Sequence, residues 1–194
     1  MFEMRFHGRG GQGAVLASKI LAKALAEEGR HVKAIPSFGF ERRGAPVTAY
    51  LRFSDNPIRQ TTNIYNPNCV VCLDPTLPQS VDIFERIQSG GIWIQSTKKS
   101  VDRLAFPGEV TTIGLCDAFG IALKIFGRTI VNSTMLGAFS RTTGLVTLDS
   151  LYNAMATVAF RDAALEKNIL ACKTGYEQCR VIHNGEGTLD EKTG

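Results

Sequence analysis

The chain has 194 residues, 44% of them hydrophobic, and a formal net charge of +4 at pH 7. This length and apolar content allow a substantial core, so we expect one domain over residues 1–184 and a polar tail over residues 185–194. Lys and Arg are spread along the sequence except for the pairs Arg42-Arg43 and Lys98-Lys99, which gives nucleic-acid binding no support. No apolar run approaches the roughly 20 residues of a membrane span, and we expect a cytoplasmic protein without such a span.

The five cysteines are odd in number and irregularly spaced, which argues against a disulfide framework and fits a reducing compartment. Cys69-x-x-Cys72 lies in an apolar run typical of a buried strand, so we interpret both cysteines as core residues; a redox or zinc motif is the alternative. The sequence has no ferredoxin-type cysteine run, and we expect this chain alone to bind no iron–sulfur cluster.

In chain order, the first expected elements are a strand at residues 4–6 and a helix that begins near Val15, joined by a loop with four glycines in six positions. Such a loop exposes the N-terminal amides of the helix to a ligand. Three of its glycines fit the G-x-G-x-x-G spacing that places a pyrophosphate on a helix N-terminus, a weak signal by itself. The candidate site residues in the loop are Gly8, Arg9, Gly10, Gly11, Gln12, Gly13 and Ala14.

The first helix is expected to end at Gly29 and to expose Lys19, Lys23 and Glu27, because its apolar residues fall on the opposite side. A strand at residues 31–36 follows, and in a dinucleotide-binding unit an acid at its end would bind the ribose. No acid occurs there, which disfavours NAD and FAD.

The next segment, residues 38–46, places Arg42 and Arg43 between Gly39 and Gly44. A solvated loop is one interpretation. An anion-binding or subunit-docking loop is the other, because adjacent arginines on a flexible backbone can reach outward.

Further strands are expected at residues 47–53, 69–73, 92–95 and 110–113, and helices at residues 77–89, 118–126, 135–141, 148–160 and 167–178. Asn132 or Ser133 is the expected cap of the helix at 135–141. Asp74 follows a strand and is interpreted as a cap or turn residue in preference to a site residue. The alternation predicts an α/β fold: a Rossmann-like, open, mostly parallel sheet flanked by helices, with a helical C-terminal part.

A self-sufficient enzyme would show a nucleophile with its base, paired acids or metal ligands. None is found: His7, His31 and His183 are scattered, and the glycine loop lacks the Gly-Lys-Ser/Thr ending of a nucleotide-hydrolysing P-loop. We therefore expect no catalytic or metal-binding residue in this chain and assign the chemistry to a partner.

Two motifs together, Gly8-Arg9-Gly10-Gly11-Gln12-Gly13 and Ser37-Phe38-Gly39-x-Glu41-Arg42-Arg43-Gly44-Ala45-Pro46, resemble the gamma subunit of the 2-oxoacid:ferredoxin oxidoreductases. Pyruvate:ferredoxin oxidoreductase is the best-known member. Asn132-x-x-Met135-Leu136-Gly137-Ala138, Glu166-Lys167-Asn168 and Gly175-Tyr176-Glu177 extend the similarity over nearly the whole chain.

The resemblance implies a complex that decarboxylates a 2-oxoacid oxidatively, forms an acyl-CoA and passes electrons to ferredoxin or to an NAD-linked acceptor subunit. Thiamine diphosphate, Mg and [4Fe-4S] clusters would belong to alpha, beta and delta type subunits. This chain would contribute subunit packing and bind coenzyme A phosphates with the loop from Gly8 to Ala14, while Arg9, Arg42 and Arg43 add charge or dock a neighbour. Pyruvate, phenylglyoxylate and indolepyruvate stay open as substrates. The alternatives are a stand-alone dinucleotide-binding reductase and a purely structural adaptor.

Overall fold

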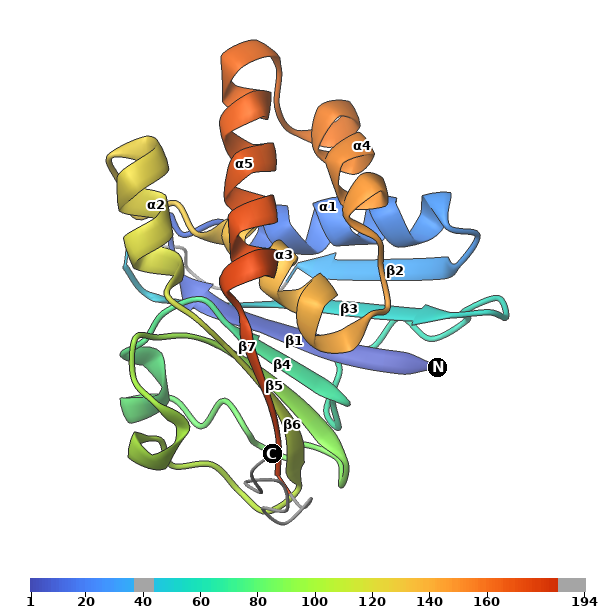
Figure 1. The fold of residues 1–194 in the computed structure, drawn as a ribbon. Coiled ribbons are helices and arrows are strands. Elements are labelled where there is room, and N and C mark those ends of the chain that lie inside the picture. Colours follow the sequence, from blue (N-terminus) through green and yellow to red (C-terminus); the bar gives the residue numbers. More distant parts are fainter. Residues whose placement is uncertain (37–43, 185–194) are drawn as a thin grey trace, which may run out of the picture.

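A seven-stranded sheet forms the centre of the molecule, and helices cover one of its faces (Figure 1). The computed structural model describes residues 1–36 and 44–184, so Arg42, Arg43 and the expected tail at 185–194 lie outside the described residues. The strands are β1 Phe2–Arg9, β2 His31–Pro36, β3 Pro46–Ser54, β4 Cys69–Cys72, β5 Gly91–Ser96, β6 Val110–Cys116 and β7 Arg180–His183. The predicted α/β class is confirmed, and every expected strand overlaps an observed one.

The sheet is mixed, with the order β2-β3-β1-β4-β5-β6-β7. The pairs β1–β4, β4–β5 and β5–β6 are parallel, whereas β2–β3, β3–β1 and β6–β7 are antiparallel. Parallel pairing is therefore limited to the centre of the sheet, and the expected mostly parallel sheet is in fact mixed because antiparallel strands are added at both edges. Fewer than the roughly dozen residues of a crossover separate β2 from β3, which fits their antiparallel pairing.

Five helices lie on one face of the sheet: α1 Ala14–Glu27, α2 Ala118–Phe126, α3 Asn132–Thr143, α4 Leu148–Val158 and α5 Asp162–Gln178. Helix α3 is the most enclosed, because its first nine residues are all buried. Its Gly137 lies against the backbone of α5, where an added Cβ would come within 1.9 Å of the Cys172 carbonyl oxygen. Gly175 of α5 lies against Thr134 in the same way, so small residues let the two helices approach closely.

The other face is covered by irregular segments with two short 3₁₀ helices, η1 Leu77–Gln79 and η2 Val101–Arg103. The helix predicted for residues 77–89 is therefore wrong. The Arg5 guanidinium donates to the main-chain carbonyls of Ile83 and Glu85, which a helix would use internally. Arg86 has a φ of 56°, which also breaks a right-handed helix.

The C-terminal part is helical as predicted, with three differences. Helix α3 begins at Asn132 after Val131 and has no side-chain cap, so the expected cap at Asn132 or Ser133 is wrong. Helix α5 begins earlier than expected, and β7 was not predicted at all. Within the described ranges, none of the helices has both the length and the apolar character that crossing a bilayer demands.

Candidate functional site

The glycine loop follows β1 at the edge of the sheet where the parallel strands β1, β4, β5 and β6 end. Gly11 and Gly13 have φ values of +96° and +84°, a backbone conformation that side chains disfavour. Gly13 directly precedes α1 and offers no side-chain cap. The first amides of α1 therefore have no partner within the helix and are available to an anionic ligand.

A cavity of about 350 Å³ adjoins this loop, within the usual range for small-molecule sites. Five of the predicted loop residues line it, and two do not. The full lining is Arg9, Gly10, Gly11, Gly13, Ala14, Val15, Leu16, Lys19 and Val47. Gly8 instead lies against Gln12, Ala14 and Leu73, where an added Cβ would come within 3.3 Å of the Gln12 Oε1 atom.

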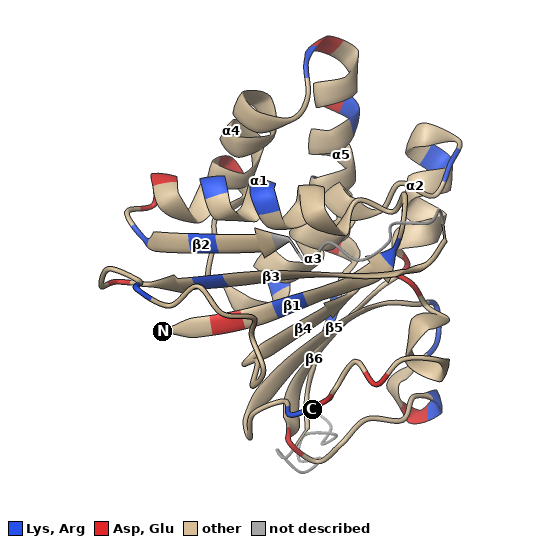
Figure 2. Cartoon of the chain, turned by 180° about the vertical axis from the view of Figure 1, so that it is seen from behind, with Lys and Arg blue, Asp and Glu red and all other residues tan. Residues whose placement is uncertain are grey.

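The sequence interpretation missed the lining residues Val15, Leu16, Lys19 and Val47. Of these only Lys19 is charged, and it was missed because its helical position places it on the solvent side of α1. It lies about 9 Å along the helix axis from Gly13, and helix side chains tilt toward the N-terminus, which brings the ammonium group to the cavity. Figure 2 shows Lys and Arg dispersed over helices, strands and loops. The two cationic residues that line this cavity are Arg9 and Lys19.

The loop backbone is paired with the two residues that precede β3. The Gly10 amide donates to the Ala45 carbonyl at 2.9 Å, and the Gly44 amide donates back to the Gly10 carbonyl at 3.2 Å. A turn within the loop is closed by the main-chain N–H of Gln12, which donates to the main-chain carbonyl of Arg9 at 3.0 Å. These bonds fix one side of the cavity before any ligand arrives.

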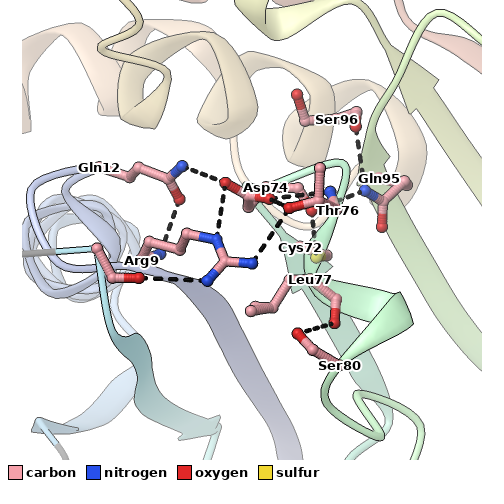
Figure 3. Close-up of polar contacts among 10 residues, drawn as sticks. Arg9, Gln12, Cys72, Asp74, Thr76, Leu77, Ser80, Gln95 and Ser96 are labelled. Carbon is pink, nitrogen blue, oxygen red and sulfur yellow. Dashed lines mark hydrogen bonds and ion pairs between the residues drawn. The ribbon is translucent and has the colours of Figure 1, made fainter.

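On its other side the loop is bonded to the segment after β4 (Figure 3). The Arg9 guanidinium donates to the Gly44 carbonyl at 3.2 Å and to the Thr76 hydroxyl at 3.1 Å, and its Nε lies 3.4 Å from Asp74 Oδ2. Gln12 accepts from the Arg9 amide at 2.7 Å and donates to Asp74 Oδ2 at 2.5 Å. The loop is thus held through both its backbone and its side chains.

Asp74 closes a turn and also belongs to the site. Its Oδ1 accepts from the Thr76 amide at 2.9 Å and from the Thr76 hydroxyl at 2.6 Å, which confirms the predicted turn role. Burial raises the pKa of Asp74, but hydrogen bonds from Thr76 and Gln12 and the charge of Arg9 outweigh burial, and the net pKa is lowered. The carboxylate is therefore ionised at neutral pH.

The buried cysteines and the buried histidine of the sheet do not line the cavity beside the glycine loop. Cys69 and Cys72 are core residues of β4, as predicted, and burial raises the pKa of Cys72 to about 12. Burial, followed by the charge of Arg5, lowers the pKa of His7 to about 3, so its imidazole is neutral. Within residues 1–36 and 44–184, no group of three or more His, Cys, Asp or Glu side chains is arranged to hold a metal ion.

The strand order argues against the dinucleotide-binding alternative. In that fold the acid that binds the ribose lies at the end of the strand next to the glycine loop. Here β3 lies between β1 and β2, and β2 ends in Ala34-Ile35-Pro36, without an acid. The adenine-ribose half of NAD or FAD therefore lacks its usual contact.

Fold and site together define an α/β protein that offers a glycine loop and a cavity to an anionic ligand. Comparison with known proteins specifies the class further. Residues 3–178 match the family described as pyruvate ferredoxin/flavodoxin oxidoreductase. The chain belongs to this family, as a gamma subunit of the multi-subunit 2-oxoacid:ferredoxin oxidoreductases, which confirms the predicted resemblance.

Three relatives support this assignment. The gamma subunit of NADH-dependent phenylglyoxylate dehydrogenase from Aromatoleum evansii is 56% identical over 183 residues, covering 94% of this chain and 96% of that protein. The common gamma subunit of the pyruvate/ketoisovalerate oxidoreductases from Thermococcus kodakarensis is 48% identical over 186 residues, covering 93% and 98%. The crystal structure of the pyruvate oxidoreductase subunit PORC from Thermotoga maritima has a TM-score of 0.80 at 37% identity and covers 93% of this chain and 97% of that chain.

Proposed function

We propose that this chain binds coenzyme A through the glycine loop and presents it to a reaction centre held by other subunits of the complex. The observation that carries the proposal is the cavity in which Gly10, Gly11, Gly13 and Ala14 adjoin the first amides of α1, which have no partner within the helix. Coenzyme A carries phosphates, the groups that such amides bind best.

The side chains around the cavity add positive charge to this amide cradle. Lys19 and Arg9 both line the cavity, and each adds a positive charge there. Arg42 and Arg43, which lie outside the described residues, extend the proposal: they contact the ligand phosphates or dock a neighbouring subunit.

The complete enzyme is proposed to convert a 2-oxoacid to its acyl-CoA with thiamine diphosphate, Mg and [4Fe-4S] clusters on alpha, beta and delta type subunits in the cytoplasm. Ferredoxin or an NAD-linked subunit accepts the electrons. The 56% identity to the phenylglyoxylate relative favours an aryl 2-oxoacid, with pyruvate and indolepyruvate as the other substrates to assay. Identifying the proteins that purify with the native chain tests the subunits, and a scan of 2-oxoacids tests the substrate.

The test of coenzyme A binding compares two lysines on α1 in the native complex. Lys19 lines the cavity, whereas Lys23 lies one turn further along and pairs with Glu27 at 3.1 Å. Lys19→Ala is expected to raise the KM for coenzyme A about tenfold at unchanged kcat, since a hydrogen bond to a charged group contributes about 1.5 kcal/mol or more. Lys23→Ala should leave the KM unchanged.

Arg42→Ala supplies the second arm of this test. A raised KM for coenzyme A places Arg42 among the ligand contacts, and an unchanged KM in an intact complex leaves subunit docking as its role. Unchanged KM values for Lys19→Ala and Arg42→Ala together would contradict ligand binding at this cavity and favour the purely structural adaptor.

A further inference from the structure

We infer that Gln12 and Asp74 are positioning residues: together with Arg9 they hold the glycine loop in the shape that receives the phosphates. The inference rests on the proposed coenzyme A site and assigns the roles of three side chains within it. The hydrogen bonds that join the loop to the segment after β4 carry it (Figure 3).

Gln12 connects the far end of the loop to its beginning and to Asp74. Its Oε1 accepts from the Arg9 amide at 2.7 Å, and its Nε2 donates to Asp74 Oδ2 at 2.5 Å. Both ends of the side-chain amide are therefore engaged, and displacing Asp74 also displaces the Arg9 main chain.

Arg9 is committed to the protein and acts on a ligand through the loop. Its nitrogens point to the Gly44 carbonyl, the Thr76 hydroxyl and Asp74. A phosphate that took one of these hydrogen bonds would release a loop contact. The loop amides and Lys19 are thus left as direct ligands, with Arg9 as a fixed charge behind them.

Asp74 is a rigid anchor because the centre of the sheet holds it. Only 6% of the residue is exposed, and its main-chain carbonyl accepts from Gln95 of β5 at 3.3 Å and from the Cys72 thiol at 3.2 Å. The loop after β1 is therefore tied to the ends of both β4 and β5.

The contact between Gln12 and Asp74 provides a test, because a donor there faces an ionised acceptor. Replacing Gln12 by Glu would bring two carboxylate oxygens together, so that they either share a proton or separate. The two carboxylates can share a proton only while the pH is below the raised pKa of the pair. Above that pKa both carboxylates are ionised, and their repulsion pushes the loop away from residue 74. Among the described residues, the ionisable groups beside Asp74 are the Arg9 guanidinium and the Cys72 thiol. Burial raises the pKa of Cys72 to about 12, so this thiol stays neutral between pH 6 and 8.5.

The experiment uses the native complex and measures the KM for coenzyme A between pH 6 and 8.5. Gln12→Glu should show a KM that rises with pH, reaching about tenfold above wild type for a shift of one pKa unit or more. The double variant Gln12→Glu with Asp74→Asn exchanges acid and amide and restores one donor and one acceptor at this contact, but it removes the carboxylate that pairs with Arg9. Its KM should therefore lie above wild type and no longer rise with pH. Gln178→Glu makes the same change at the exposed end of α5 and should behave as wild type.

Hydrogen–deuterium exchange of residues 9–14 in the ligand-free complex separates this inference from the proposed function. Exchange that increases with pH beyond the intrinsic rate in Gln12→Glu, and loses this extra pH dependence in the double variant, supports the positioning role whatever happens to the KM. If exchange changes in this way but the KM does not, the positioning role stands and coenzyme A binding at the loop fails. If neither exchange nor KM departs from wild type in Gln12→Glu while Lys19→Ala raises the KM, the positioning role is overturned and the proposed function stands.

Discussion

Two glycines of the loop have positive φ, and substituting each by alanine distinguishes the cost of backbone strain from the cost of a steric contact. Gly11 has a φ of +96° and nothing within 4 Å of an added Cβ. Gly13 has a φ of +84°, and an added Cβ would lie 3.0 Å from Asn132 Nδ2 and 3.2 Å from its Cβ and Cγ. Alanine in a left-handed conformation costs about 1–2 kcal/mol at either position. At Gly13 the contact with Asn132 adds about 1 kcal/mol or more.

Asn132 cannot move away freely, which is why this extra cost is expected. It is 1% exposed at the start of α3, and its Oδ1 accepts from the Ser133 amide at 2.9 Å. In Gly13→Ala the loop therefore leaves the binding conformation more often than in Gly11→Ala. The apparent affinity for a ligand falls with the fraction of molecules in the competent conformation.

The assay is the KM for coenzyme A in the assembled complex. Gly11→Ala is expected to raise it about 5- to 30-fold and Gly13→Ala about fivefold further, since 1.4 kcal/mol is a factor of ten. Combining Gly13→Ala with Asn132→Ala should recover most of the difference between the two glycine variants, with Asn132→Ala alone completing the cycle. Equal effects of Gly11→Ala and Gly13→Ala, or no recovery in the double variant, would refute the steric reasoning.

Two further predictions concern stability. Gly137→Ala should lower the free energy of unfolding of the chain by about 3 kcal/mol, because the added Cβ would overlap the Cys172 carbonyl of α5 and force the two helix backbones apart. Thermal unfolding of the complex measures this loss. Gly108→Ala is the control, because nothing lies within 4 Å of a Cβ added there. Burial keeps the pKa of His7 at about 3, below the value of 6.5 in the unfolded chain. The stability that neutral His7 provides is therefore complete above pH 6.5 and declines as pH falls toward 3, by up to about 1.4 kcal/mol per pH unit. His7→Leu should flatten this part of the pH profile of unfolding, and an unchanged slope would contradict the assignment.

The glycine loop and every observed strand except β7 could be predicted because their signals are local. The spacing of Gly8, Gly10 and Gly13 and the alternation of apolar residues report the backbone conformation of the same residues. The apolar run Cys69–Cys72 is buried on both faces, and its interpretation as a central strand with core cysteines is confirmed.

Features that depend on distant partners could not be predicted. The segment at residues 77–89 has helical periodicity, but Arg5 of β1 takes its carbonyls and fixes an irregular path. The bond between Gln12 and Asp74 joins residues 62 positions apart. The place of β3 between β1 and β2, which removes the ribose contact of a dinucleotide site, also depends on pairing between strands rather than on local pattern.

The central claim is that coenzyme A phosphates lie against the glycine loop and the first turn of α1. Hydrogen–deuterium exchange of the native complex with and without coenzyme A tests it most directly. The account predicts protection by coenzyme A that is strongest over residues 10–16, compared with the remote helix α4. Protection elsewhere in the complex with no change over residues 10–16 would contradict it.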